Sequence, residues 1–307
     1  MAFEARYIEQ VSLLIAVLPF VAKEKDFALK GGTAINLFVR DMPRLSVDID
    51  LTYLPVEDRD TSLRNAEVAL RRMAESINLG SPNPDILYSP KKPLTRFDVR
   101  LGGTIKIEVN PVLRGCLFPP EPRAVMPSVE EQFGFAEVPV VSFADLYAGK
   151  ICAALDRQHP RDWFDVKLLL DNEGITRPLV QALLVYLSSG DRPIHELLSG
   201  RWQDLRATFQ NHFVGMTKQS VELADLEATR DRLLDEIATH LTATDCEFLL
   251  SVKRAEPKWE LLGLPAAERL PALQWKLLNL RKMAPKKHAE AVGHLETALE
   301  RLRKRKR

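Results

Sequence analysis

Apolar side chains recur at helical or strand spacing through the first part of the chain, and the period changes between segments. Residues 5–23 carry apolar residues at helical spacing, which predicts an amphipathic helix. A short strand is predicted over residues 27–29, and a brief helix follows over residues 33–38. A charged helix is predicted over residues 58–78. This part of the chain therefore mixes helices with strands.

Two further segments alternate between apolar and polar side chains. Residues 45–54 place three apolar side chains on one face and Asp48 and Asp50 on the other, which predicts a strand. Residues 95–110 form two alternating runs separated by Gly102-Gly103. A glycine pair between such runs is typical of a hairpin with a tight primed turn.

The remainder of the chain is predicted to be first irregular and then helical. Residues 111–140 are rich in proline and show no period. Helices are predicted over residues 142–157 and 160–171, and successive amphipathic helices follow from about residue 176. The predicted fold class is α/β (α+β), with a small mixed sheet followed by an all-helical half. We expect two domains, residues 1–174 and 175–307.

The composition is that of a globular protein, with 307 residues, 46% hydrophobic and 28% charged side chains. Cys116, Cys152 and Cys246 lie far apart and lack CxxC spacing, so they predict neither a disulfide framework nor a zinc site. They fit a reducing cytoplasm. The first ten residues do not resemble a signal peptide, and the apolar stretch 11–22 is too short to cross a bilayer. We therefore expect a cytoplasmic protein without a membrane partner.

Charge is balanced over the whole chain but not at its end. The net charge of +1 predicts no nucleic-acid partner by itself. Residues 281–307, however, hold ten Lys and Arg against three Glu. Such a run can contact phosphates, or it can be a solvated terminus. The sequence leaves both interpretations open.

Asp48 and Asp50 form a candidate metal site. Side chains two apart on a strand project from the same face, about 7 Å apart along the backbone. Two carboxylates at that spacing can turn toward one divalent cation, and Mg²⁺ or Mn²⁺ is the hard ion that also brings substrate phosphates. In a two-metal site the ions activate the attacking hydroxyl and stabilise the leaving pyrophosphate.

A metal site of this kind usually needs a third carboxylate. Glu108 is placed for this role, because the alternation over residues 104–110 puts Lys106 and Glu108 on the polar face of the second hairpin strand. Asp98, on the facing strand, is the competing acid. A site that uses only the two aspartates and a carboxylate from elsewhere, such as Asp165, is the remaining alternative.

Gly31-Gly32-Thr33 stands between a predicted strand and a predicted helix. Glycine lets the backbone approach a ligand, and amides at the start of a helix donate well to phosphate. Strand, glycine pair, short helix and Asp48-Ile-Asp50 together resemble the polymerase-beta-like nucleotidyltransferases, and more narrowly the AbiEii toxin family of type IV toxin–antitoxin systems, which includes the MenT toxins. The resemblance implies a nucleotidyltransferase core in which the glycine turn holds the triphosphate and the two aspartates hold metal.

Residues 142–166 also resemble that family. Lys150 and Arg157 share one face of a predicted helix, and Asp162 and Asp165 are neighbours on the next. The resemblance implies that Lys150 contacts nucleotide phosphate and that Asp165 is needed for activity. Arg157 offers forked donors for phosphate or base recognition. The alternative is a salt-bridge network that ties the two helices together.

Two other residues of this stretch have chemistry that could be catalytic. His159 precedes a proline in a predicted turn, so we expect it to cap a helix or lie on the surface. Cys152 lies among alanines on a predicted helix, which favours core packing over a nucleophilic role.

The predicted function is a metal-dependent nucleotidyltransferase toxin that transfers nucleotides from NTP to RNA, most plausibly the 3′ end of tRNA, and so blocks translation and growth. The alternatives are nucleotidylation of a protein acceptor and a non-catalytic NTP- or RNA-binding module. The family resemblance also implies a cognate antitoxin encoded nearby, which need not form a stable complex. We expect the toxin to be a monomer.

Overall fold

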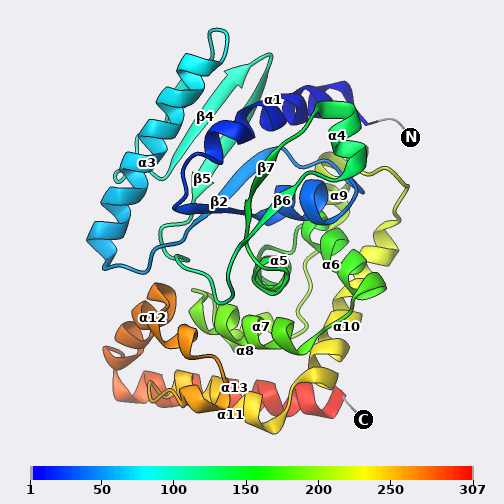
Figure 1. The fold of residues 1–307 in the computed structure, drawn as a ribbon. Coiled ribbons are helices and arrows are strands. Elements are labelled where there is room, and N and C mark those ends of the chain that lie inside the picture. Colours follow the sequence, from blue (N-terminus) through cyan, green and yellow to red (C-terminus); the bar gives the residue numbers. More distant parts are fainter. Residues whose placement is uncertain (1–2, 306–307) are drawn as a thin grey trace. The chain divides into compact units, whose positions relative to one another are not determined.

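Residues 3–305 are described by a computed structural model and pack into two compact units. The sheet unit comprises the residues up to Ser142 together with Val214–Ser220. The helical unit comprises Phe143–Phe213 and the residues from Val221 on. Figure 1 follows the chain through both.

The sheet unit is built on a seven-stranded mixed sheet with the strand order β3-β4-β5-β2-β1-β7-β6. The strands are β1 (Phe27–Lys30), β2 (Asp48–Tyr53), β3 (Asp85–Tyr88), β4 (Arg96–Leu101), β5 (Gly103–Val109), β6 (Glu121–Ala124) and β7 (Glu137–Val140). The helical segments are α1 (Ala5–Val21), α2 (Gly31–Thr33), a π-helical turn (Ala34–Val39), α3 (Arg59–Gly80) and α4 (Pro127–Phe133). The predicted α/β fold class is confirmed.

The elements predicted by periodicity are present near their expected bounds. The helices predicted over residues 5–23 and 58–78 are α1 and α3, and the predicted hairpin is β4 with β5. Its turn is tighter than expected, because Leu101 pairs with Gly103 and Gly102 alone turns the chain, with a φ of 72°. Helix α1 packs against β5 and β7, so it covers the middle of the sheet.

The prediction that residues 111–140 are irregular was wrong. This segment contains β6, α4 and β7, and β7 joins the sheet parallel to β1. The strands are four residues long, and Pro122 pairs with Pro139 across them. Proline disguises such strands because it cannot donate a backbone hydrogen bond to a neighbouring strand.

The strand predicted over residues 45–54 begins later, at Asp48. Before it, Leu45 donates its backbone N–H to Met216, and Pro43 accepts from Lys218. A segment from far along the sequence, Val214–Ser220, therefore returns to the sheet unit and lies beside the chain that enters β2. Alternation alone could not reveal this non-local pairing.

The helical unit consists of packed helices joined by short connections. They are α5 (Phe143–Arg157), α6 (Pro160–Asn172), α7 (Arg177–Ser189), α8 (Ile194–Leu197), α9 (Arg206–His212), α10 (Leu223–His240), α11 (Ala243–Lys253), α12 (Pro271–Arg281) and α13 (Pro285–Arg305), with two 3₁₀ turns at Trp259–Leu261 and Pro265–Arg269. Helix α5 packs against α6 and α7, α6 against α10, and α13 against α10 and α11.

The chain passes from the sheet unit to the helical unit after Ser142, whereas the sequence predicted a boundary after residue 174. Helices α5 and α6 belong to the helical unit because they pack against its other helices. The domain division itself stays a prediction. Within residues 3–305, no helix combines the length and the apolar character needed to cross a bilayer.

Candidate functional site

The candidate metal ligands lie on two neighbouring strands of the sheet unit. Asp48 and Asp50 begin β2, which runs parallel to β5, with Asp48 opposite Lys106 and Asp50 opposite Glu108. The residues between them, Ile49 and Ile107, are fully buried, so the polar residues occupy the opposite face of the sheet. The fold thus brings Glu108 beside Asp50, as pairing of the hairpin strand with β2 requires.

A lysine stands among these carboxylates. The Lys106 ammonium lies 3.0 Å from the Glu108 carboxylate and 3.9 Å from that of Asp48. Burial alone would lower the pKa of Lys106, but the negative charges of Asp48, Glu108 and Asp50 outweigh it and raise the pKa above its ordinary value. Lys106 therefore carries a positive charge at neutral pH and offsets part of the repulsion between the acids.

A second lysine approaches the site from the other side of β2. Lys30 ends β1 and stands opposite Asp50 in the antiparallel pairing of β1 with β2. Burial lowers the pKa of Lys30, although Asp50 and Glu108 act in the opposite direction. Three carboxylates are thus accompanied by two lysines on adjacent strands.

The glycine pair is required by the close approach of side chains from β2 and the segment before it. Gly31 has a φ of 74°, and a Cβ built on it would stand 2.5 Å from Oδ2 of Asp50. A Cβ on Gly32 would stand 2.8 Å from both Arg44 Nη2 and Ser46 Oγ. Any larger residue would displace these groups. The pair therefore packs the start of the helical segment directly against Asp50.

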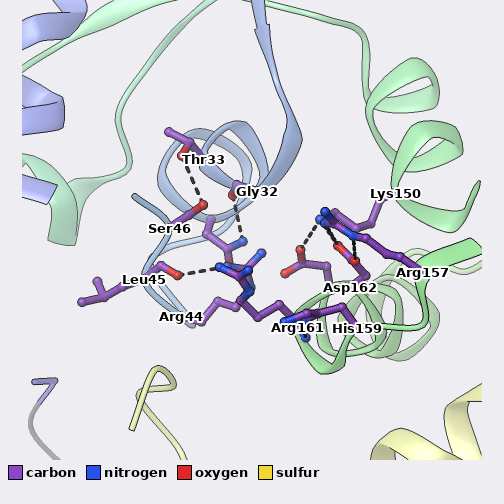
Figure 2. Close-up of polar contacts among 12 residues, drawn as sticks. Gly32, Thr33, Arg44, Leu45, Ser46, Lys150, Arg157, His159, Arg161 and Asp162 are labelled. Atoms are coloured by element: carbon purple, nitrogen blue, oxygen red, sulfur yellow. Dashed lines mark hydrogen bonds and ion pairs between the residues drawn. The ribbon is translucent and has the colours of Figure 1, made fainter. Parts of the chain in front are cut away.

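Thr33 uses its hydroxyl inside the protein. It is buried, and its Oγ1 donates to the Asp48 carbonyl at 2.5 Å and lies 3.2 Å from Ser46 Oγ. Figure 2 shows Thr33 beside Ser46, and Arg44 turned toward the carbonyl of Leu45, to which it donates at 2.9 Å. The Thr33 side chain thus ties the glycine turn to the first residue of β2.

The donors at this site suit a hard divalent cation, since Asp48, Asp50 and Glu108 offer only carboxylate oxygens. Within residues 3–305, no three His, Cys, Asp or Glu side chains are gathered closely enough to hold a metal as they stand. Asp48 and Asp50 share one strand face, and Glu108 is turned toward Lys106. The residues therefore fit a metal whose main ligands are the two aspartates.

Asp98, the competing third acid, is engaged elsewhere. It lies on β4, where it faces Lys106 in the β4–β5 pairing and is separated from β2 by β5. Both of its oxygens accept hydrogen bonds from Arg96 at 3.0 Å. In the sheet unit, Glu108 is therefore the better placed of the two acids.

The second predicted cluster forms within the helical unit. The Lys150 ammonium of α5 lies 2.8 Å from Asp162 and 2.9 Å from Asp165, both on α6. All three side chains are buried, and the two aspartates have no exposed surface. The structure brings Lys150 together with Asp165, the acid that the resemblance pointed to, and with Asp162, which the sequence also placed in this cluster.

Asp162 is the centre of this cluster. Arg157 donates to both of its oxygens, at 2.6 and 2.9 Å, and Lys150 donates to one of them (Figure 2). Burial would raise the pKa of Asp162, but the charges of Lys150 and Arg157 lower it well below its ordinary range. The predicted salt-bridge network between the two helices is therefore present.

His159 caps α6, as expected from its place before Pro160. Its Nδ1 accepts a hydrogen bond from the backbone N–H of Arg161 at 3.1 Å, which requires the neutral ring. Burial, followed by the charge of Arg161, lowers the pKa of His159 to about 4. Cys152 is not a nucleophile, because burial raises the pKa of its thiol to about 12.

Sequence reasoning missed the part that two lysines play in the sheet unit. Lys30 and Lys106 accompany the carboxylates of β2 and β5, whereas Asp162 was already expected beside Lys150 and Arg157. The alternation that selected Glu108 also placed Lys106 on the same face, so its role could have been inferred. Lys30 gave no such signal, because its position depends on the pairing of β1 with β2.

The known proteins that this chain is similar to are nucleotidyltransferases. The family described as nucleotidyl transferase AbiEii toxin, type IV TA system, matches residues 12–279. Among solved structures, the chain is similar to MenT4, a nucleotidyltransferase toxin from Mycobacterium tuberculosis H37Rv, with a TM-score of 0.63 and 18% identity over 89% of this chain and 95% of that one. No curated protein matches. The chain belongs to the AbiEii family of nucleotidyltransferase toxins of type IV toxin–antitoxin systems.

Proposed function

We propose that this nucleotidyltransferase transfers a nucleotide from an NTP onto the 3′ end of tRNA in a reaction that depends on Mg²⁺ or Mn²⁺, and that it thereby blocks translation and growth. Membership of a toxin family that acts with an NTP substrate and an antitoxin partner supports the general activity. The observation that carries the proposal is the close approach of Gly31 to Asp50, which places the glycine turn at the start of a helical segment beside the carboxylate pair.

Asp48 and Asp50 would hold the metal, with Glu108 as the third carboxylate. Their register on adjacent parallel strands supports this assignment, as does the engagement of Asp98 with Arg96. When bound, the metal would polarise the α-phosphate, activate the acceptor hydroxyl and stabilise the departing pyrophosphate. Lys106 supplies a positive charge beside Glu108 and Asp48, which offsets part of the repulsion between these carboxylates.

The glycine turn would bind the triphosphate through its backbone. Gly31, Gly32 and Thr33 open a helical segment, where N–H groups are available to an anion. The Thr33 hydroxyl is committed to the Asp48 carbonyl, so we assign Thr33 a backbone contact with phosphate. The acceptor hydroxyl oxygen would then bond to the α-phosphorus, the bond to the β-phosphate would break, and pyrophosphate would leave.

We also assign roles in nucleotide binding to Lys150, Arg157 and Asp165 of the helical unit. An ammonium has three N–H donors, and Lys150 directs two of them at Asp162 and Asp165. The third remains for a β- or γ-phosphate, while Asp162 and Asp165 keep the amine charged and in place. Arg157 is held by Asp162 at one edge of its guanidinium, and its side chain is 60% exposed, so it can also bind phosphate or base.

The acceptor is identified by incubating purified protein with Mg²⁺, total RNA and each labelled NTP in turn. We expect label in a band of tRNA size from one or more NTPs, and loss of that band on RNase treatment. Label that survives RNase and is lost with protease would contradict the RNA acceptor and favour a protein acceptor. NTP binding by calorimetry without any transfer would favour a non-catalytic module.

Toxicity is tested by inducible expression. We expect the wild type to arrest growth and Asp50→Ala to leave it unchanged at equal protein level. Growth arrest by Asp50→Ala would contradict an enzymatic mechanism. We further propose that the toxin is a cytoplasmic monomer whose antitoxin, encoded by a neighbouring gene, does not form a stable complex with it.

A further inference from the structure

The helical unit contains a basic cleft that the proposed reaction does not use. We call it the α8–α13 cleft. It has a volume of about 640 Å³ and is bounded by α8, the turn after it and the second half of α13. Its charged and titratable lining comprises Arg192, His195, Glu196, Arg201, His294, Arg301 and Arg305. Four arginines thus face a single carboxylate.

The period of α13 explains how the basic end of the chain contributes to this cleft. His294, Arg301 and Arg305 are spaced by seven and four residues, so they share one helix face. Leu295 and Leu299 are buried on another face, against the rest of the unit. The basic run is therefore not merely a solvated terminus up to residue 305. Residues 306 and 307 lie outside the described residues.

Two of the arginines are held in place by neighbouring residues. Arg305 donates to Asp235 at 2.8 Å and to Asp231 at 2.9 Å, both on α10. Arg192 donates to the Asp156 carbonyl at 2.7 Å and to the Glu196 carboxylate, which itself lines the cleft, at 3.3 Å. These contacts fix two guanidinium groups before any ligand arrives, which lowers the entropy lost on binding.

Arg201 and Arg301 supply the charge that remains for a ligand. Both side chains are exposed at the rim, and neither forms an ion pair with another residue in the described part of the chain. Between the walls, the rings of His195 and His294 lie 5.0 Å apart. Burial and His294 lower the pKa of His195, so this pair is not the main source of positive charge.

We propose that the α8–α13 cleft binds the phosphodiester backbone of RNA, an inference that rests on the proposed RNA acceptor. Guanidinium groups make forked hydrogen bonds to phosphate, and several of them along a cleft match a chain of regularly spaced anions. A protein partner is favoured less, because protein interfaces have an apolar and aromatic centre. This cleft has no aromatic lining apart from the two histidines, and its apolar lining is limited to Leu198, Ala298 and Leu302.

The test measures equilibrium binding of tRNA to the full chain without NTP, by fluorescence anisotropy across a range of salt concentrations. The variant is the double substitution Arg201→Gln with Arg301→Gln. Its control is Arg269→Gln with Arg281→Gln, which removes the same charge from exposed positions of the same unit that do not line the cleft. For the cleft variant we expect the dissociation constant to rise about tenfold and the salt slope to fall by about 2, one for each lost phosphate contact. The control should change less than twofold.

A third variant, Arg201→Lys with Arg301→Lys, separates charge from folding. It should keep the salt slope of the wild type, since each lysine still neutralises a phosphate. If all variants have the same thermal midpoint and the glutamine double variant binds tRNA like the wild type, the cleft proposal is wrong.

Incorporation of labelled NTP into RNA is measured in parallel and keeps the two proposals apart. If the wild type labels RNA and the glutamine double variant binds tRNA normally, the proposed function holds and the cleft proposal is wrong. A wild type that neither binds nor labels RNA would overturn both. Weaker binding by the glutamine double variant, with transfer restored at saturating RNA, would support both.

Discussion

Lysines meet aspartates at two places in this protein, and the two places differ in how far water reaches them. In the sheet unit, the side chains of Asp48, Lys106 and Glu108 keep 39%, 28% and 42% of their surface exposed. In the helical unit, Lys150 keeps 6%, and Asp162 keeps none. The first group contains more acids than bases, whereas the second pairs Lys150 and Arg157 with Asp162 and Asp165.

This difference in exposure indicates two roles for the same residue types, ligand binding where they are exposed and mutual stabilisation where they are buried. Exposed charges interact weakly with each other, because water screens them, and they stay available to a ligand. Buried charges depend on each other, because losing one partner leaves the other without compensation in a medium of low dielectric. We infer that the carboxylates of β2 act on substrate, and that Asp162 acts by holding Lys150 and Arg157.

The largest effect is expected from Asp50→Asn. The amide removes the proposed metal-binding carboxylate while keeping the shape of the side chain, so we expect NTP incorporation into RNA to fall about a thousandfold. Its matched control is Asp98→Asn, which removes an acid of the same sheet that is paired with Arg96. The control should retain activity within a few fold. Equal losses in both variants would mean that general charge on the sheet, and not the β2 carboxylate, supports the reaction.

For Asp162→Ala we expect a loss of stability, whereas for Asp50→Asn we expect a loss of activity. Removing this carboxylate takes one of two acids from Lys150 and a bidentate partner from Arg157, so the free energy of unfolding should fall by about 3–5 kcal/mol. All four tryptophans, Trp163, Trp202, Trp259 and Trp275, lie in the helical unit, so urea unfolding followed by tryptophan fluorescence reports on that unit.

The control for Asp162→Ala is Asp204→Ala. Asp204 pairs with Arg206 at 2.6 Å, the same N–O distance as between Arg157 and Asp162, but on the surface. Its loss should leave the urea midpoint almost unchanged, because surface ion pairs contribute little. A similar loss of stability in both variants would refute the distinction between buried and exposed clusters.

The sequence predicted the parts of this site that depend on local pattern. Alternation placed Asp48 and Asp50 on one face of β2, and the glycine pair marked a close approach. Which strand lies beside β2 is a non-local fact, because β5 is joined to it through α3 and two further strands. The third carboxylate therefore stayed open between Glu108 and Asp98 until the register of β2 with β5 was known.

The same limit explains the errors. The short strands that contain proline, β6 and β7, have too few residues for a period. The return of Val214–Ser220 to the sheet unit leaves no local signal in the sequence. In the helical unit, by contrast, helical spacing brought Lys150, Arg157, Asp162 and Asp165 into one expected cluster. Sequence could not tell that Asp162 was its centre, because burial decides this.

A smaller effect is expected from Gly31→Ala, which separates backbone strain from displacement of Asp50. An alanine at a φ of 74° is strained by about 1–2 kcal/mol, and its Cβ would stand 2.5 Å from Oδ2 of Asp50. Gly102→Ala is the control, since its φ is 72° and nothing lies within 4 Å of the added Cβ. Both variants should unfold at similarly lower urea concentrations by circular dichroism. Only Gly31→Ala should lose activity, by more than tenfold, and full activity there would show that Asp50 tolerates displacement.

The smallest effect is a pH dependence in the helical unit. The pKa of His159 is lowered to about 4, whereas an unfolded histidine titrates near pH 6.5. Between these values the unfolded chain binds a proton that the folded chain resists, so stability should fall as the pH drops from about 6.5 toward 4. The depressed pKa of Asp162 leads to a separate loss at still lower pH, below about 4. His159→Asn keeps a helix-capping side chain without a titrating group. We expect it to flatten the dependence of the urea midpoint on pH between 6.5 and 4.5, and an unchanged slope would assign that dependence to other groups.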